Sequence, residues 1–322
     1  ASAEILCFRT IQLEEGFNMK IMKFTDYITW LILCVGVCIG CSDKEEVVPS
    51  DLKDNYFAVP DDATDPESLL RKSFKQETGI HLLFNDTLRC ELRGTDRYGE
   101  KSYLVETVNY SYYLTSVIKP CYLFTYIHDI EEQKVAAEFI KERVLSAFSS
   151  KIYPYSLLLA KKIDCWQLNN EQDAYEMTEE DLVYISGWKG MAISCRNILE
   201  MTESEKAVYA EEVLREVVAD NISKVDEKEF DRFFSYAETY YEKWSIFAPL
   251  SDIKTVGFLG SNPLMGTVRV WYTKAEDQAS YVNALLSMTE DEFMAENGDY
   301  PACVTKWKEM KRILTDLGLK FE

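Results

Sequence analysis

Residues 191–222 read MAISCRNILEMTESEKAVYAEEVLREVVADNI, and this stretch decides the fold class. Apolar residues over 191–198 predict a strand. Thr202 is followed three residues later by Glu205, which is the spacing of a capping box, so a helix is expected to begin there and run to about Ile222. The stretch therefore predicts a strand that leads directly into a long helix.

Further helices and strands are predicted on both sides of this unit. Helical spacing of apolar residues is found over 67–78, 129–149, 229–244, 275–295 and 301–317, and glycines follow the first and last of these. Strand patterns are found over 81–84, 157–159, 163–168, 255–259 and 268–272. The Tyr-rich segment 102–117 fits either type and is predicted as a helix. Long helices mixed with strands, without regular βαβ alternation, indicate the α+β class with a mixed sheet.

The N-terminal region predicts export and lipid anchoring. Lys20 and Lys23 precede an apolar run over 27–40. As a helix this run would span about 21 Å, which is shorter than a hydrocarbon core of about 30 Å, so it predicts a signal peptide. The run ends in Cys38-Ile-Gly-Cys41, which resembles a lipobox except that Cys38 stands where Leu or Val is usual. Cys41 is therefore the expected lipidation site.

These features divide the chain into three parts. Residues 1–40 are an upstream segment and lipoprotein signal peptide, 41–66 a flexible tether, and 67–322 one large α+β domain. The tether is polar and rich in Pro, Asp and Asn, a composition that buries too little apolar surface to fold. Its first residues, Ser-Asp-Lys-Glu-Glu, resemble the surface-export signal of Bacteroidetes lipoproteins. We therefore expect a lipid-anchored protein on the outer membrane, exposed at the cell surface.

Charge and cysteine content exclude some functions. The formal net charge of −20 argues against nucleic acid or anionic lipid as a partner, because both attract positive surfaces. The cysteines after Cys41 form no CxxC pair, so a zinc ribbon is excluded. They are odd in number and are expected to be buried free thiols: Cys90, Cys121, Cys165, Cys195 and Cys303.

Several segments, taken in order, resemble one protein family. They are SLLRKSFKQETGIHLLFND (68–86), LAKKI (159–163), the unit at 191–222, EFDRF (229–233), GFLGSN (257–262), KAEDQASYV (274–282) and KWKEMKRILTDLGLKFE (306–322). This order resembles the substrate import-associated zinc metallohydrolase lipoproteins of Bacteroidetes, which are encoded beside TonB-dependent uptake systems. The resemblance implies a zincin-like scaffold. It also implies a TonB-dependent transporter and its substrate-binding lipoprotein as partners.

The resemblance places the family's zinc site on the helix that follows Thr202. A zincin needs two histidines at i and i+4, and the Glu after the first of them acts as general base. Here Glu216 stands at the position of the base, whereas Arg215 and Ala219 stand at the positions of the histidines. Glu276 matches the family's third ligand. One carboxylate without two imidazoles is too few ligands for a catalytic zinc, so the helix is predicted to be a degenerate active-site helix and no cofactor is expected.

The remaining polar residues suggest no second site. His81 and His128 are the only histidines; they lie on separate elements and are expected to be structural. Glu211 lies one turn before Arg215, so the two are expected to form an ion pair. Gly187-Trp-Lys-Gly190 is expected to be a turn between strands.

The sequence therefore predicts a non-catalytic, pseudo-metallopeptidase lipoprotein that assists TonB-dependent nutrient uptake. Two alternatives stay open. One is an active zinc metallohydrolase or peptidase with divergent ligands, the only case in which zinc is expected. The other is a surface glycan-binding lipoprotein that uses its many Tyr and Trp side chains.

Overall fold

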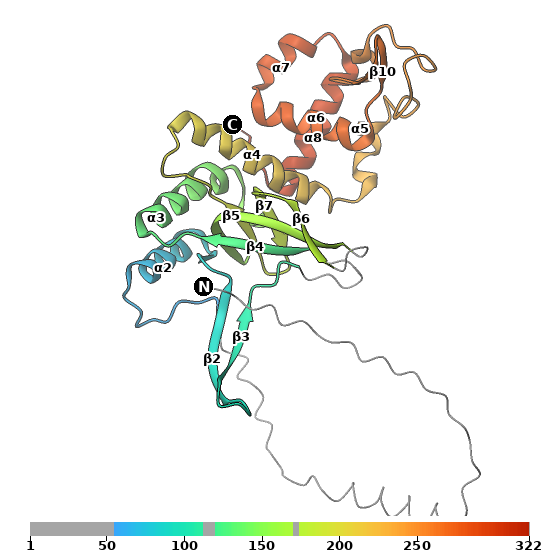
Figure 1. Ribbon diagram of the computed structural model, residues 1–322. Coiled ribbons are helices and arrows are strands. Elements are labelled where there is room, and N and C mark those ends of the chain that lie inside the picture. The colour runs from blue at the N-terminus through green and yellow to red at the C-terminus, as the bar shows by residue number, and fades with distance from the viewer. Residues whose placement is uncertain (1–54, 112–119, 170–173, 322) are drawn as a thin grey trace, which may run out of the picture. The chain divides into compact units, whose positions relative to one another are not determined.

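A computed structural model describes residues 55–111, 120–169 and 174–321 of the chain (Figure 1). The predicted signal peptide, the lipobox and Cys41 lie outside the described residues. Among the described residues, none of the helices is long and apolar enough to cross a membrane.

A six-stranded mixed sheet lies at the centre of the fold, in agreement with the predicted α+β class. Its longest strand, β5 (Ser156–Asn169), pairs in parallel with β1 (His81–Leu83) and β8 (Gly190–Ser194). Two strands pair with it in antiparallel fashion, β4 (Cys121–Tyr126) and β6 (Ala174–Glu179). At the edge, β7 (Tyr184–Gly187) forms a hairpin with β8, whose turn is the predicted Gly-Trp-Lys-Gly segment.

Helices account for most of the remaining structure. The longer ones are α2 (Pro66–Thr78), α3 (Ile130–Phe139), α4 (Glu203–Ile222), α6 (Lys274–Ser287), α7 (Glu290–Asn297) and α8 (Pro301–Leu317). The shorter ones are α5 (Asp231–Phe234), a π-helix at Ile140–Val144, and 3-10 turns at Leu145–Ala147, Ser150–Ile152, Glu227–Phe230 and Ile253–Val256.

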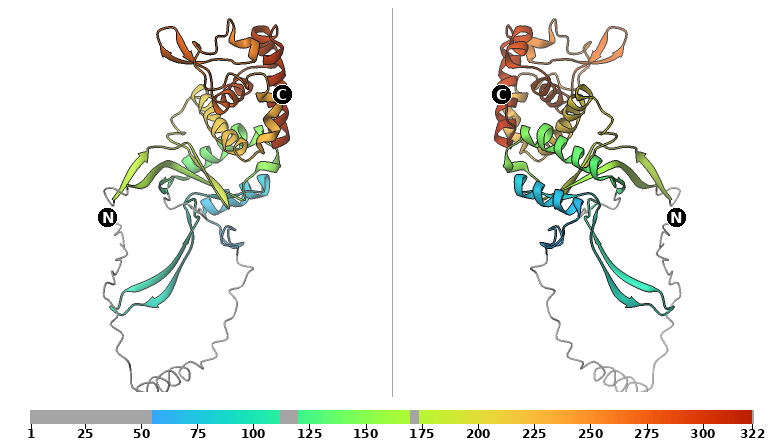
Figure 2. Two further views of the ribbon diagram at one scale, coloured as in Figure 1. Left: turned by 90° about the vertical axis from the view of Figure 1, so that its right-hand side faces the viewer. Right: turned by 90° about the vertical axis from the view of Figure 1, so that its left-hand side faces the viewer.

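Two small antiparallel pairs complete the elements. The ribbon β2 (Thr87–Thr95) and β3 (Lys101–Thr107) projects away from the central sheet (Figures 1 and 2). The pair β9 (Asn262–Met265) and β10 (Val268–Val270) lies in the C-terminal part of the chain, before α6.

The two faces of the sheet bury different sets of residues. Successive side chains of a strand point to opposite faces. Leu157 and Leu159 of β5 pack in the main core, which also holds buried residues of α2, α3 and α4. Leu158 and Ala160 face a smaller cluster on the other side, together with Phe57. The helix predicted after Thr202 is thereby fixed against the sheet, on the same side as α2 and α3.

Local capping explains where the helices begin and end. Thr202 and Glu205 form the predicted capping box at the start of α4. Equivalent boxes start α6 and α7. Gly79 and Gly318 end α2 and α8 in the left-handed conformation, at φ 83° and 114°, which glycine adopts without the steric cost that other residues incur.

Several predicted elements differ from the observed ones. The helix predicted over 129–149 is α-helical only to Phe139 and continues as a π-helix and a 3-10 turn. The strands predicted over 157–159 and 163–168 are the single strand β5. The segment 101–107 is the strand β3 instead of a helix, because it pairs along its length with β2; residues 112–119 lie outside the described part. The helix predicted over 229–244 is reduced to a 3-10 turn and the four-residue α5, followed by turns. Residues 253–256 form a 3-10 turn, not a strand. The helix predicted over 275–295 is two helices, since a new capping box at Thr289 interrupts it.

The boundary of the domain and the state of the cysteines also differ from expectation. The compact unit begins at Asn55, before the predicted end of the tether at residue 66, because Phe57 is buried against the sheet. Among the described cysteines, all free, Cys90 and Cys121 are exposed. Cys90 lies on β2, most of whose residues are exposed on both faces, and Cys121 lies on the exposed face of β4. Only the other three are buried as predicted.

Candidate functional site

A pocket of about 480 Å³ lies between α4 and α6. The α4 wall includes Arg215, Glu216 and Ala219, and the α6 wall includes Gln278 and Ala279. Residues three and four apart lie on one face of a helix, so each wall is a single helix face. The opposite side of α4 carries buried residues that anchor it in the main core, Val213, Val217 and Val218 among them.

The pocket brings together three of the four residues that the sequence predicted for the site. Arg215, Glu216 and Ala219, which the sequence resemblance aligns with the two histidines and the general base of a zincin, all line it. The fourth, Glu276, lies on the facing helix but is not among the lining residues.

Glu276 is committed to the start of its own helix. Its carboxylate accepts hydrogen bonds from the backbone N–H of Thr273 and from Asn262 Nδ2, both at 2.8 Å. These bonds hold the pKa of Glu276 below its ordinary value. The sequence Thr273-Lys-Ala-Glu276 has the same capping-box spacing that predicted the start of α4. That signal identifies Glu276 as a capping residue, and Gln278 takes its place in the pocket wall.

The charged groups of the pocket are weakly engaged. Arg215 Nη2 lies 3.5 Å from Glu211 Oε2, which confirms the predicted i,i+4 pair. The side chains are 43% and 42% exposed, so the pair contributes only about 0–1 kcal/mol. Within the described residues, the side chains of Glu216, Gln278 and Asn283 make no hydrogen bond or ion pair with the protein. Each is therefore available to a bound molecule.

The histidines lie elsewhere, in agreement with their expected structural roles. His81 is buried on β1, and its ring centroid is 4.9 Å from that of Tyr155. Burial lowers the pKa of His81 below its ordinary value. The ring of His128 contacts that of Tyr126, with centroids 6.4 Å apart. Over residues 55–111, 120–169 and 174–321, no group of three or more His, Cys, Asp or Glu side chains is arranged to hold a metal ion.

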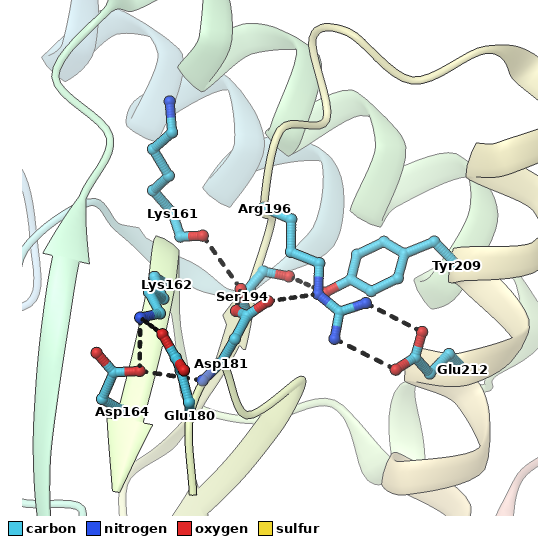
Figure 3. Close-up of polar contacts among 9 residues, drawn as sticks. All are labelled: Lys161, Lys162, Asp164, Glu180, Asp181, Ser194, Arg196, Tyr209 and Glu212. Carbon is cyan, nitrogen blue, oxygen red and sulfur yellow. Dashed lines mark hydrogen bonds and ion pairs between the residues drawn. The ribbon is translucent and has the colours of Figure 1, made fainter. Parts of the chain in front are cut away.

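A polar network that the sequence did not predict joins α4 to the end of β8 (Figure 3). The guanidinium of Arg196 lies between two carboxylates, with Nε 2.9 Å from Asp181 Oδ2 and two nitrogens 3.2 and 3.3 Å from the oxygens of Glu212. It also lies 4.7 Å from the ring centroid of Tyr209. Ser194 donates to Asp181 Oδ1 at 2.9 Å.

This network is structural, because its charged groups are paired with one another. Asp181 and Arg196 both have positive φ, 54° and 47°, a strained conformation that surrounding contacts must maintain. The hydroxyl of Tyr209 donates to the carbonyl of Ser194, and burial raises the pKa of this tyrosine. These contacts fix the first half of α4 relative to the sheet, and so they position the pocket wall in its second half.

A buried ion pair holds the other wall of the pocket. Asp277 of α6 and Lys306 of α8 are completely buried, with 2.6 Å between Oδ2 and Nζ. Tyr241 donates to the same carboxylate oxygen at 2.6 Å. The ammonium also lies 5.0 Å from the ring centroid of Phe233 and 5.1 Å from that of Phe258. Because Asp277 points away from the pocket, it braces α6 from behind.

Comparison of the chain with protein-family models, with curated proteins and with solved structures finds no match in any of the three. The functional proposal therefore depends on the residues of the α4–α6 pocket.

Proposed function

We propose that this chain is a cell-envelope lipoprotein that assists TonB-dependent nutrient uptake as a non-catalytic binding subunit. Its scaffold is zincin-like, and its zinc site has been lost. One observation carries the proposal. Arg215, Glu216 and Ala219, which stand at the positions of a zincin's two histidines and general base, line one pocket.

The chemistry of the pocket suits binding better than hydrolysis. A catalytic zinc site keeps three protein ligands and one open position for water. At the two histidine positions this chain has a permanent cation and a methyl group. The facing wall offers Gln278, whose neutral amide is a poor replacement for a carboxylate ligand. Without the two histidines to hold a zinc, Glu216 would lack the metal-bound water that a zincin's general base activates.

The alternative of an active hydrolase with divergent ligands predicts a different metal content. We expect the purified full-length chain to contain no stoichiometric zinc and to cleave no peptide library. A chain that retains one zinc through dialysis against a weak chelator would support the alternative. The glycan-binding alternative gains no support from the pocket, because none of its lining residues is aromatic.

Lipid anchoring at Cys41 is tested by substitution. Cys41→Ala removes the thiol that would carry the lipid, so the chain should remain an uncleaved or soluble precursor without radiolabelled lipid. Cys38→Ala is the matched control, because it removes a nearby thiol and leaves the attachment position intact. Equal lipid incorporation in the wild type and in Cys41→Ala would refute the anchor.

Placement on the outer face of the outer membrane is tested separately. Protease added to intact cells should digest the protein as readily as a known surface protein. Complete protection under conditions that digest the surface protein would place the chain in the periplasm.

A further inference from the structure

The α4–α6 pocket presents one positive and one negative side chain that are adjacent in sequence. Arg215 and Glu216 both line it, and neighbouring Cα atoms lie about 3.8 Å apart. Since both side chains extend from α4 into the same pocket, a ligand that satisfies both must carry opposite charges.

Apolar side chains make up about half of the pocket lining. Its walls include three alanines, Ala219, Ala275 and Ala279, together with Ile222 and Val282. Such side chains favour an aliphatic group through burial of apolar surface. A pyranose ring would lack the aromatic surface on which sugars commonly stack. The volume, about 480 Å³, lies in the lower part of the range of small-molecule sites, which is about 300–1,000 Å³.

The polar groups of the pocket are free to exchange partners. Within the described part of the chain, the ion pair of Arg215 is the exposed one with Glu211 at 3.5 Å. Glu216, Gln278 and Asn283 have no side-chain partner there. A ligand carboxylate therefore displaces at most one weak pair, and a ligand ammonium displaces only water from Glu216.

From this arrangement we infer that the pocket binds a small zwitterion with an aliphatic side chain, a free α-amino acid or a dipeptide. Arg215 takes the carboxylate, Glu216 takes the ammonium, and the aliphatic group lies against the alanine-lined walls. The amides of Gln278 and Asn283 are available to a dipeptide's peptide group. The inference rests on the proposed function, in that it treats the pocket as a binding site and not a catalytic one.

Isothermal titration of the purified full-length chain in detergent tests the inference with four probes. Leucine and leucyl-leucine carry both charges, leucinamide lacks the carboxylate, and N-acetyl-leucine lacks the ammonium. At least one zwitterion should bind at least tenfold more tightly than both singly charged probes. Tighter binding of leucine identifies a free amino acid as the ligand, and tighter binding of leucyl-leucine identifies a dipeptide.

Two variants assign each charge to its side chain. Arg215→Gln should bind leucine and leucinamide equally, while still discriminating against N-acetyl-leucine. Glu216→Gln should show the opposite pattern. The control is Arg269→Gln, which removes an exposed arginine of β10 outside the pocket and should behave as the wild type.

Two results would overturn the inference. One is a wild-type chain that does not distinguish the zwitterions from the singly charged probes, including a chain that binds none of them. The other is a wild-type preference that survives in both pocket variants. Stoichiometric zinc in the wild-type chain would instead refute the proposed function, so the two failures are distinguishable.

Discussion

Replacing Lys306 with methionine tests how the helices behind the pocket are held together. Lys306 and Asp277 are both completely buried, and 2.6 Å separates their charged atoms. Methionine retains an unbranched aliphatic side chain but removes the ammonium. The carboxylate of Asp277 then remains in an apolar environment with the hydroxyl of Tyr241 as its hydrogen-bond donor.

The expected cost follows from the burial of both partners. Removal of one member of a buried ion pair costs about 3–5 kcal/mol, because the remaining charge is left without compensation. The exposed pair of Lys311 and Glu290 has a similar distance, 2.7 Å, but its side chains are 34% and 47% exposed. Lys311→Met should therefore lower the free energy of unfolding by no more than about 1 kcal/mol.

Urea unfolding followed by tryptophan fluorescence measures both variants. A third variant, Asp277→Leu with Lys306→Met, removes both charges and should recover most of the loss, since apolar replacement of a whole buried pair is often neutral. Burial raises the pKa of Asp277, so the folded Lys306→Met chain takes up a proton more readily than the unfolded chain. The loss of unfolding free energy in Lys306→Met relative to the wild type should therefore become smaller as the pH falls. If Lys306→Met costs no more than Lys311→Met, the reasoning is wrong.

Two further predictions concern packing and capping. Gly190→Ala would place a Cβ 2.6 Å from the carbonyl oxygen of Ser156, so the parallel β5–β8 pairing must shift. Thermal unfolding should show that the free energy of unfolding falls by about 1–3 kcal/mol. Glu205 and Glu292 have pKa values lowered by hydrogen bonds in their capping boxes. The pKa of glutamate in an unfolded chain is about 4.3. The stability that the two residues contribute is fully present above that pH and is lost as the pH falls through their lower pKa values in the folded chain. With glutamine at both positions, the unfolding midpoint should fall less between pH 5 and pH 3 than it does in the wild type. An equal fall in both chains would refute the contribution of the capping carboxylates to stability.

Features that depend on neighbouring residues could be predicted from the sequence. The capping box at Thr202, the helix end at Gly79 and the pair of Glu211 with Arg215 all involve residues within four positions of one another. The same local rule, applied to Thr273, would have identified Glu276 as a capping residue.

Features that depend on distant residues could not be predicted in this way. The partner of Asp277 is 29 residues away on another helix, and spacing along the chain does not reveal it. Arg196 and Asp181 adopt positive φ because contacts between β7, β8 and α4 maintain them. The aromatic residues of 229–244 showed helical spacing, yet only the four residues of α5 are α-helical there. Phe230, Phe233 and Phe234 are buried and Trp244 is exposed. A hydrophobic pattern indicates which side chains tend to be buried, but it does not specify the backbone conformation that buries them.

The most direct test of the proposal that the pocket is a former zinc site compares two engineered motifs on the same helix. Arg215→His with Ala219→His creates H-E-x-x-H around Glu216 inside the pocket, and Gln278→Glu adds a carboxylate from the facing wall. The control, Ser204→His with Val208→His, creates the same motif around Glu205 on an exposed part of α4. Zinc titration in a competing chelator measures the affinity of each variant and of the wild type.

If the pocket is a former metal site, the triple variant should bind one zinc at least tenfold more tightly than the control, because a third ligand from α6 completes the coordination. The wild type should bind none. Equal zinc affinity in the triple variant and the control, or stoichiometric zinc in the wild type, would contradict the account.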